Sequence, residues 1–269
     1  MTQPFLKKYA PKTFEDFILQ DDMIYFIKSI IETQNINILI NGKIGAGKTS
    51  MINLIINTYY KGIENYETNI MNINCLKEQG IQYYRNEVKH FCQTKTCING
   101  KKKILLLDDI DDINEQSQQI FRNYIDKYTD NVIFITSCCD INKVNEHILC
   151  RLFIIKLCSI TNDKLNELCD KIIKEEKLQI SDVVKNDVVK LSNYSFRNLL
   201  CNLEKIKLAN IVIDDTNIYK VCSNINFNHY KDYTREVLNN NLQEACGIIK
   251  SICDEGYSII DIFYFYFIF

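Results

Sequence analysis

Residues 36–49 read Ile-Asn-Ile-Leu-Ile-Asn-Gly-Lys-Ile-Gly-Ala-Gly-Lys-Thr, and this stretch decides the fold. An apolar run with strong β propensity leads into a glycine loop ending in Lys48-Thr49, and a helical pattern follows. The spacing from Gly42 to Lys48 matches G-x-x-x-x-G-K-[ST], whose glycines let backbone N–H groups approach phosphate oxygens. This order of strand, loop and helix favours a nucleotide-binding loop over a chance glycine turn.

The motif gives each loop residue a role. The Lys48 ammonium is expected to contact the β- and γ-phosphates of a nucleotide, and the Thr49 hydroxyl is expected to ligate Mg²⁺. The residues expected to surround the phosphates are Gly42, Lys43, Ile44, Gly45, Ala46, Gly47, Lys48, Thr49 and Ser50.

The composition is that of an ordinary globular protein, because 46% of the 269 residues are hydrophobic and 25% are charged. The length suggests two or three domains. The 32 Lys and Arg residues against 34 Asp and Glu residues leave a net charge of -2, so the chain as a whole has no positive charge that would attract nucleic acid. Any binding of nucleic acid must therefore come from a local face.

The 12 cysteines are scattered from Cys75 to Cys253 without a CxxC pair, and only 3 histidines accompany them. A disulfide framework is one interpretation, but we expect reduced, mostly core-filling thiols in an intracellular protein. The N-terminus lacks the apolar stretch of a secretory signal. The most apolar segment, residues 258–269, is shorter than the roughly 20 residues of a membrane span and contains Asp261. We therefore expect no membrane association.

Apolar runs alternate with amphipathic segments in the first half of the chain. Strands are predicted at residues 36–40, 70–75, 104–107 and 131–137, and helices at 21–31, 50–56, 81–91 and 116–128. An extended lead-in is predicted over residues 5–17. Because the strands are continuously apolar, we expect an α/β fold with a parallel sheet covered by helices on both faces.

The second half of the chain has a helical pattern throughout. Helices are predicted at residues 164–176, 181–192, 196–210, 230–240 and 242–254. Boundaries are expected near residues 151–157 and 214–226.

Two acids follow the predicted strand at residues 104–107. Asp108 lies where a carboxylate can hold Mg²⁺ through water at the carboxyl end of a strand. Asp109 lies where a general base would orient an attacking water. The plain alternative is a solvated acidic turn over residues 108–112.

Four further stretches match motifs of a single protein family. The stretches are Lys-Tyr-Ala-Pro-Lys-Thr at 8–13, Asn-Cys-Leu-Lys-Glu-Gln-Gly-Ile at 74–81 followed by Arg-Asn-Glu-Val-Lys at 85–89, Gln-Gln-Ile-Phe-Arg at 118–122, and Leu-Cys-Arg at 149–151. They are similar to the K-Y-R-P-K-T, N-A-S-D-E-R-G-I…R-N-x-I-K, Q-N-A-L-R and S-R-C elements of replication factor C small subunits. These are sliding-clamp loaders of the AAA+ class. The resemblance extends from Tyr9 to about Lys205.

The resemblance implies a P-loop AAA+ domain at residues 1–153, a helical lid at 154–214 and a partial helical collar at 215–269. It implies an ATP-dependent clamp loader for DNA replication, with ATP and Mg²⁺ as cofactors. The implied partners are other clamp-loader subunits in a hetero-oligomeric ring of five, a sliding clamp and primer-template DNA. The implied location is the nucleus or a cytoplasmic replication site.

The resemblance also implies roles for residues outside the glycine loop. Tyr9 would pack near the adenine, and Arg151 would be an arginine finger acting on ATP held by the neighbouring subunit. Arg197 resembles the second-sensor arginine that contacts the γ-phosphate from the lid.

Four other residues match positions of the family that contact DNA or couple it to ATP. Gln118 and Arg122 match the coupling positions, whereas Arg85 and Lys89 lie four residues apart and could contact one stretch of DNA backbone. A surface salt bridge or a snorkelling side chain is the plain alternative for each arginine. The Lys101 to Lys103 run is more simply a solvated loop than a DNA-binding patch.

The sequence departs from the family at two catalytic positions. Asp109 replaces the glutamate of D-E-A-D, and Cys139 replaces the asparagine of the first sensor. A base misplaced by about 1 Å can cost about 10²-fold in rate, and a thiol is a weak hydrogen-bond donor. We therefore expect intact phosphate binding with slow hydrolysis. Ala10 and Leu149 replace an arginine and a serine of the family motifs.

The sequence leaves open two alternative functions and two interpretations of the C-terminal segment. The chain could be a nucleotide-binding scaffold that does not hydrolyse ATP, or another AAA+ DNA-associated ATPase such as a helicase loader or a branch-migration motor. The aromatic segment at residues 262–269 could be part of a buried collar helix, which we favour, or an oligomer contact.

Overall fold

Five parallel strands form one sheet in the order β2-β3-β4-β1-β5. The computed structural model describes residues 3–17, 19, 21–74, 80–96, 98–158, 160–209, 217–222, 225 and 227–268. The strands are β1 (Ile38–Asn41), β2 (Ile70–Asn74), β3 (Lys103–Asp108), β4 (Val132–Cys138) and β5 (Phe153–Lys156). The predicted α/β class and parallel sheet are therefore confirmed.

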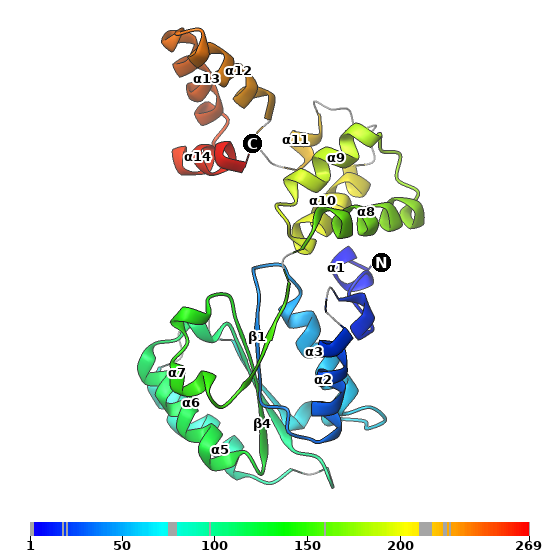
Figure 1. The fold of residues 1–269 in the computed structure, drawn as a ribbon, viewed down its shortest axis with the longest axis vertical. Coiled ribbons are helices and arrows are strands. Elements are labelled where there is room, and N and C mark those ends of the chain that lie inside the picture. The colour runs from blue at the N-terminus through cyan, green and yellow to red at the C-terminus, as the bar shows by residue number, and fades with distance from the viewer. Residues whose placement is uncertain are drawn as a thin grey trace. The chain divides into compact units, whose positions relative to one another are not determined.

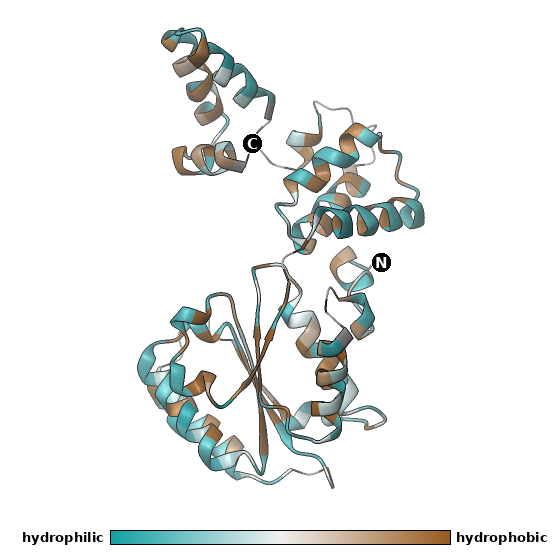
Figure 2. Ribbon diagram, viewed as in Figure 1, coloured by the Kyte–Doolittle hydropathy of each residue, from teal (hydrophilic) through white to brown (hydrophobic). Residues whose placement is uncertain are grey.

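The central strands are buried because their side chains are apolar on both faces. All seven residues of β4 are buried, as are the first five of β3. Figure 2 shows this apolar character along the strands of the sheet. Leu107 lies opposite Thr136, and Asn41 lies opposite Cys138. The carboxyl ends of β1, β3 and β4 therefore meet at one edge of the sheet, where polar residues follow each strand.

Helices cover both faces of the sheet (Figure 1). On one face, α2 (Asp21–Glu32) and α3 (Lys48–Tyr59) pack through Ile27, Ile52 and Ile55. On the other face lie α5 (Lys89–Gln93), α6 (Glu115–Tyr128) and α7 (Glu146–Leu149), whose core includes Phe121 and Ile148. These helices fix the sheet edge at which the glycine loop lies.

The lead-in at residues 5–17 is not extended, so that prediction is wrong. It contains α1 (Phe5–Lys8) and the 3₁₀ turn η1 (Phe14–Asp16). Asp16 Oδ2 accepts hydrogen bonds from the backbone N–H groups of Lys12 and Thr13, both at 2.9 Å. Such short turns arise from local capping and from a few buried aromatic side chains, so they leave no periodic pattern in the sequence.

Two other elements differ from their predicted form. The helix predicted at residues 81–91 comprises α4 (Ile81–Tyr83), the π-helical turn η3 (Tyr84–Val88) and α5. Strand β5 was not predicted, because three of its four residues are exposed at the sheet edge and lack the pattern of a buried strand. The part of the family-like block at residues 75–79 lies outside the described residues.

The chain divides into two units, residues 1–161 and 162–269. Since β5 continues the sheet past residue 153, the first unit extends beyond the predicted domain end. The remaining short elements of that unit are η2 (Tyr66–Asn69), η4 (Ile110–Asp112) and η5 (Ile141–Lys143).

The second unit is helical in all its described elements. They are α8 (Asn162–Glu176), α9 (Asp182–Leu191), α10 (Phe196–Ala209), α11 (Asn217–Cys222), α12 (Phe227–Leu238), α13 (Leu242–Asp254) and α14 (Ile259–Ile268). Helices α8 to α11 pack on one another, and α13 packs against both α12 and α14. Its division into lid and collar stays a prediction, and residues 214–216, 223, 224 and 226 of the predicted boundary lie outside the described residues.

The C-terminal aromatic segment is helical but is not buried within this chain. In α14, Ile262 is 4% exposed, whereas Ile260 is 80% and Phe267 is 86% exposed. The expectation of a buried helix is therefore wrong for the chain by itself.

The ten cysteines that the structure describes are free, and Cys92, Cys138, Cys169 and Cys222 are buried. Burial raises the pKa of the Cys169 thiol to about 11, which keeps it protonated near neutral pH. These buried thiols fill core space, but Cys139, Cys150, Cys158 and Cys246 are exposed, so the prediction of mostly core-filling thiols is wrong for the described cysteines. Within the described parts of the chain, the helices are too short or too polar to cross a bilayer.

Candidate nucleotide-binding site

The glycines of the phosphate loop (residues 42–49) adopt conformations that other residues would resist. Gly45 and Gly47 have φ angles of 78° and 95°, in the left-handed region. A Cβ on Gly42 would lie 3.1 Å from Leu157 Cβ. On Gly47 it would lie 3.4 Å from the Phe17 ring. The loop therefore follows the backbone path that the motif predicts.

Lys48 lies at the centre of the site, and its side chain is almost completely buried. Its Nζ donates hydrogen bonds to Gly42 O at 3.0 Å and to Cys139 Sγ at 2.9 Å. The same Nζ lies 3.9 Å from Asp109 Oδ1. The ammonium thus brings together the phosphate loop and the ends of β3 and β4, and among the described residues one carboxylate, that of Asp109, lies at ion-pair distance from it.

The other loop residues leave the cradle accessible. Lys43, Ile44 and Thr49 are exposed, and Ile44 has 73% of its surface in solvent. Gly45, Ala46, Gly47 and Ser50 are half-buried, whereas Gly42 is buried. Thr49 belongs to the first turn of α3, whose N-terminus favours anions.

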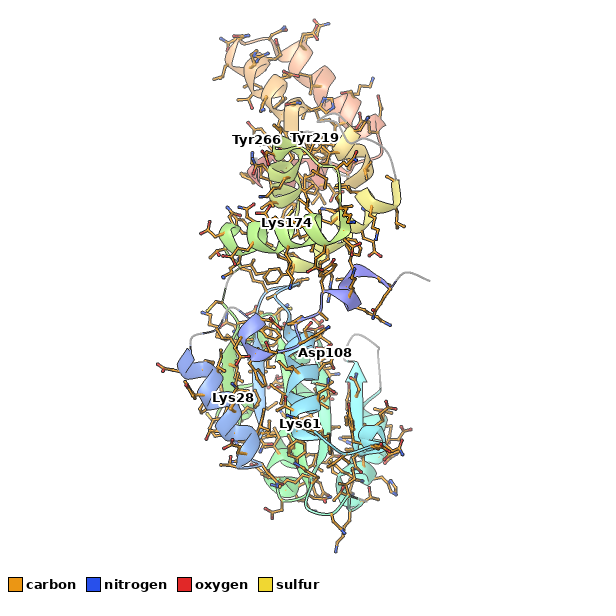
Figure 3. All side chains as sticks on the ribbon, turned by 90° about the vertical axis from the view of Figure 1, so that its right-hand side faces the viewer. Lys28, Lys61, Asp108, Lys174, Tyr219 and Tyr266 are labelled. Atoms are coloured by element: carbon orange, nitrogen blue, oxygen red, sulfur yellow. The ribbon has the colours of Figure 1, made fainter. Side chains whose placement is uncertain are left out.

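The two acids after β3 are held by a side chain from β4. Ser137 Oγ donates to Asp108 Oδ1 at 2.5 Å and accepts a hydrogen bond from Asp109 N at 2.9 Å. Asp109 has a left-handed backbone, with φ 58° and ψ 59°. Burial, and next the charge of Asp108, raise the pKa of the Asp109 carboxyl, while Lys48 opposes this effect. Figure 3 labels Asp108 in the N-terminal unit.

A second link joins the ends of β3 and β4 through Asp111. Its Oδ2 accepts hydrogen bonds from Cys139 N at 3.1 Å and from Asp140 N at 2.9 Å. Cys139 is exposed, and its Sγ lies 3.9 Å from Asp109 Oδ1. Sequence reasoning placed Cys139 at this site but missed Asp111 and Ser137. A usable signal is that both are polar residues at the carboxyl ends of buried strands.

The oxygen donors fit a magnesium ion that enters with a nucleotide. Asp108 supplies a half-buried carboxylate at the carboxyl edge of the sheet, and Thr49 supplies an exposed hydroxyl next to Lys48. Mg²⁺ keeps several waters and takes few protein ligands together with phosphate oxygens. Among the described residues, no cluster of three or more His, Cys, Asp or Glu side chains could hold a metal ion by itself. The donor set therefore fits shared coordination.

Arg151 is not at the phosphate loop of its own chain. Its Nε donates to Asp126 Oδ1 at 2.5 Å, and its Nη1 donates to His147 O at 2.6 Å. This hydrogen bond from Arg151 is the main reason that the pKa of Asp126 is lowered. Parallel pairing sets Phe153 opposite Ile38, so Arg151 lies at the amino edge of the sheet. The phosphate loop follows the carboxyl end of β1, roughly 13 Å further along the strands.

Tyr9 and Arg197 lie on different units. Tyr9 is half-buried beside α1, with its ring edge-on to Phe5 at a centroid distance of 5.5 Å. Arg197 is exposed in the first turn of α10, in the C-terminal unit. Their contacts with adenine and γ-phosphate stay predictions. Sequence reasoning missed Phe17, whose ring lies beside Gly47, within 3.4 Å of where a Cβ on that glycine would stand.

Gln118 and Arg122 lie on α6, and Gln118 Nε2 reaches Ile110 O, at 3.4 Å, in the turn that follows Asp109. Gln118 is 3% exposed, and its Nε2 donates to Lys143 O at 3.0 Å. Its Oε1 accepts a hydrogen bond from Asn145 N at 2.8 Å, so Gln118 ties α6 to the chain after η5. Arg122 Nε is buried and makes no hydrogen bond within the described part of the chain. A coupling role stays a prediction for both.

Arg85 and Lys89 are both exposed, one turn apart on η3 and α5. The structure thus leaves both side chains accessible from solvent, and contact with DNA stays a prediction.

Comparison with known families finds a match within the N-terminal unit of the chain. Residues 38–159 match the family described as "ATPase family associated with various cellular activities (AAA)". This range includes the phosphate loop, Asp108, Cys139 and Arg151.

Curated relatives match almost the whole chain. Replication factor C subunit 2 of Arabidopsis thaliana is 25% identical over 97% of this chain and 78% of its own length. Replication factor C subunit 3 of Schizosaccharomyces pombe is 27% identical over 97% of this chain and 76% of its own length. The replication factor C small subunit of Picrophilus torridus is 26% identical over 97% and 82%. The predicted resemblance is confirmed by these relatives.

Solved structures share the fold at low sequence identity. The RuvB Holliday junction branch migration motor of Thermotoga maritima has a TM-score of 0.59 and 16% identity, covering 87% of this chain and 80% of that one. Domain III of the replication initiation protein DnaA from the same organism has a TM-score of 0.56 and 18% identity, covering 78% of this chain and 95% of that one.

We predict that Asp111→Ala loosens the turn that carries Cys139. Loss of a charged acceptor costs about 1.5–3 kcal/mol, so the amides of Cys139 and Asp140 should exchange with solvent about 10–100-fold faster. Asp111→Asn should have a smaller effect, because its amide oxygen still accepts both bonds. Hydrogen exchange measures these rates. The matched control is Asp112→Ala, an exposed acid of the same turn, and equal exchange in both alanine variants would contradict the prediction.

Proposed function

We propose that this chain, a relative of the replication factor C small subunits, is an ATP-dependent subunit of a sliding-clamp loader in DNA replication. The observation that carries the proposal is the convergence of Lys48, Asp109 and Cys139 at the phosphate loop. Its partners would be other clamp-loader subunits in a hetero-oligomeric ring, a sliding clamp and primer-template DNA. It would act in the nucleus or at a cytoplasmic replication site.

Nucleotide binding uses the phosphate loop and the start of α3. The backbone N–H groups of the loop and the N-terminus of α3 face the phosphates, and Lys48 exchanges its thiol contact for phosphate oxygens. Tyr9 packs near the adenine. Asp108 and Thr49 are the residues that would hold Mg²⁺, which would supply positive charge to the phosphates.

Hydrolysis needs groups at two edges of the sheet. Asp109 orients the attacking water from the carboxyl edge, beside Lys48 and Cys139. Arg151 lies at the amino edge and acts on the ATP of a neighbouring subunit. Arg197 contacts the γ-phosphate from the helical lid. Gln118 and Arg122 transmit the state of the site, and Arg85 and Lys89 contact the DNA backbone.

A second candidate is a scaffold subunit that binds ATP without hydrolysing it. The replacement of glutamate by Asp109 and of asparagine by Cys139 favours this candidate, because both act on the water and neither is needed to bind phosphate. A branch-migration motor has no comparable support, since the likeness to RuvB shows the fold alone.

We predict that Lys48→Ala weakens ATP binding by the purified chain about 10–100-fold or more, because it removes charge-assisted hydrogen bonds to phosphate. Lys61→Ala is the matched control, since Lys61 is an exposed lysine just past the C-terminal end of α3 and outside the phosphate loop. Calorimetric titration with ATP and Mg²⁺ measures both affinities. An unmodified chain without affinity for ATP would refute the proposed function.

We predict that Arg151→Ala leaves ATP binding by the isolated chain unchanged but lowers hydrolysis in the assembled complex. A finger that stabilises phosphoryl charge contributes about 10³-fold or more to the site that it serves. Arg235→Ala is the control, because Arg235 is an exposed arginine on α12. Steady-state hydrolysis by the complex purified with its native partners measures the effect. Equal rates for the two variants would exclude a finger role.

We predict that Asp109→Glu combined with Cys139→Asn speeds single-turnover ATP hydrolysis in the assembled complex, by up to about 10²-fold. The longer carboxylate and the amide donor would restore water positioning. Asp109→Ala should abolish the residual rate. If Asp109→Ala hydrolyses ATP as fast as the parent complex, Asp109 is not the base.

A further inference from the structure

Ser137 is completely buried, at 0% exposure, near the end of β4, and its hydroxyl faces the two acids after β3. It donates its single proton to Asp108 Oδ1 at 2.5 Å and accepts a hydrogen bond from Asp109 N at 2.9 Å. One side chain on a central strand therefore restrains both acids, although it is neither an acid nor part of the phosphate loop.

We propose that Ser137 is a positioning residue for Mg²⁺, acting through Asp108. This inference rests on the proposed function, because it assigns the geometry of the same metal site. The hydroxyl proton is donated to Oδ1, so Oδ2 is the oxygen outside this bond and would be the one offered to metal-bound water. Bonds from a hydroxyl to a carboxylate are short and strong, so the carboxylate is oriented before the metal arrives.

The bond to Asp109 adds a second restraint at the same point. Asp109 has φ 58°, a conformation uncommon for a residue with a side chain. Its N–H meets Ser137 Oγ only when the chain turns sharply after Asp108. The hydroxyl therefore sets the directions of Asp108 and Asp109 relative to each other.

The neighbouring residue provides a matched control on the same strand. Thr136 is 1% exposed, and its Oγ1 donates to Ile38 O at 3.3 Å, toward β1 and away from the acids. Thr136→Val and Ser137→Ala each remove one buried hydroxyl from β4. Only the second removes a contact with Asp108.

The test measures binding of a fluorescent ATP analogue to the purified chain, first in EDTA and then over a titration of Mg²⁺. Outer-shell partners of metal ligands typically contribute 10–100-fold to metal affinity. Ser137→Ala should therefore raise, by about 10–100-fold, the Mg²⁺ concentration at which half of the Mg²⁺-dependent increase in analogue binding is reached. Its affinity for the analogue in EDTA should stay that of the parent. Thr136→Val should match the parent in both measurements.

Ser137→Cys keeps a weaker donor at the same place and should give an intermediate Mg²⁺ requirement. If Ser137→Ala fails to bind nucleotide in EDTA, Ser137→Cys replaces it in the test. A Mg²⁺ requirement of Ser137→Cys equal to that of the parent chain would then overturn the inference. Equal requirements for Ser137→Ala and Thr136→Val also overturn it, while leaving the proposed function intact. Failure of the parent chain to bind the analogue under any condition refutes the proposed function instead.

Discussion

The Lys48 ammonium is the constraint on which the N-terminal unit depends. It is 8% exposed, and its hydrogen bonds go to a carbonyl oxygen and a thiol, both uncharged. Asp109, at 3.9 Å, is the carboxylate that partly compensates its charge. A buried cation with incomplete compensation is costly, because desolvation is not fully repaid by its partners. A polyphosphate would supply the missing negative charge. Its binding would compensate the unfavourable desolvation of Lys48, which increases the affinity for the anion.

The strand order determines which residues can share this site. β1 lies between β4 and β5, and β4 separates it from β3, so the loop, Asp109 and Cys139 meet at the carboxyl edge. Ser137 and Asp111 tie the ends of β3 and β4 together, which fixes the spacing between these groups. The same parallel pairing sends Arg151 to the opposite edge. Arg151 and the phosphate loop therefore lie at opposite edges of the sheet, so the finger role proposed for Arg151 requires the ATP of another chain.

Much of this arrangement could be predicted, because continuous apolar runs and a phosphate-binding motif depend only on local sequence. The strands β1 to β4 and the helices α8, α9, α10, α12 and α13 followed from such patterns. By contrast, β5 has an exposed edge face, and η1 is closed by the side chain of Asp16. The roles of Ser137 and Asp111 depend on the register between β3 and β4, which no local pattern specifies. The glycine loop and Asp108 were predictable, but the hydroxyl that orients the acid was not.

In the proposed mechanism, binding and hydrolysis depend on different elements of this fold, and that separation lets the two departures from the family coexist with an intact motif. Phosphate contacts come from the β1–α3 loop, whose glycine angles and lysine are those that the motif requires. Water positioning comes from the turns after β3 and β4, where Asp109 and Cys139 lie. Because Asp111 and Ser137 hold those turns by backbone and carboxylate contacts, their shape does not depend on the residue at position 139. A change there alters the side chain that the proposed mechanism offers to water and the partner of Lys48 Nζ, while the glycine angles of the phosphate loop do not involve position 139.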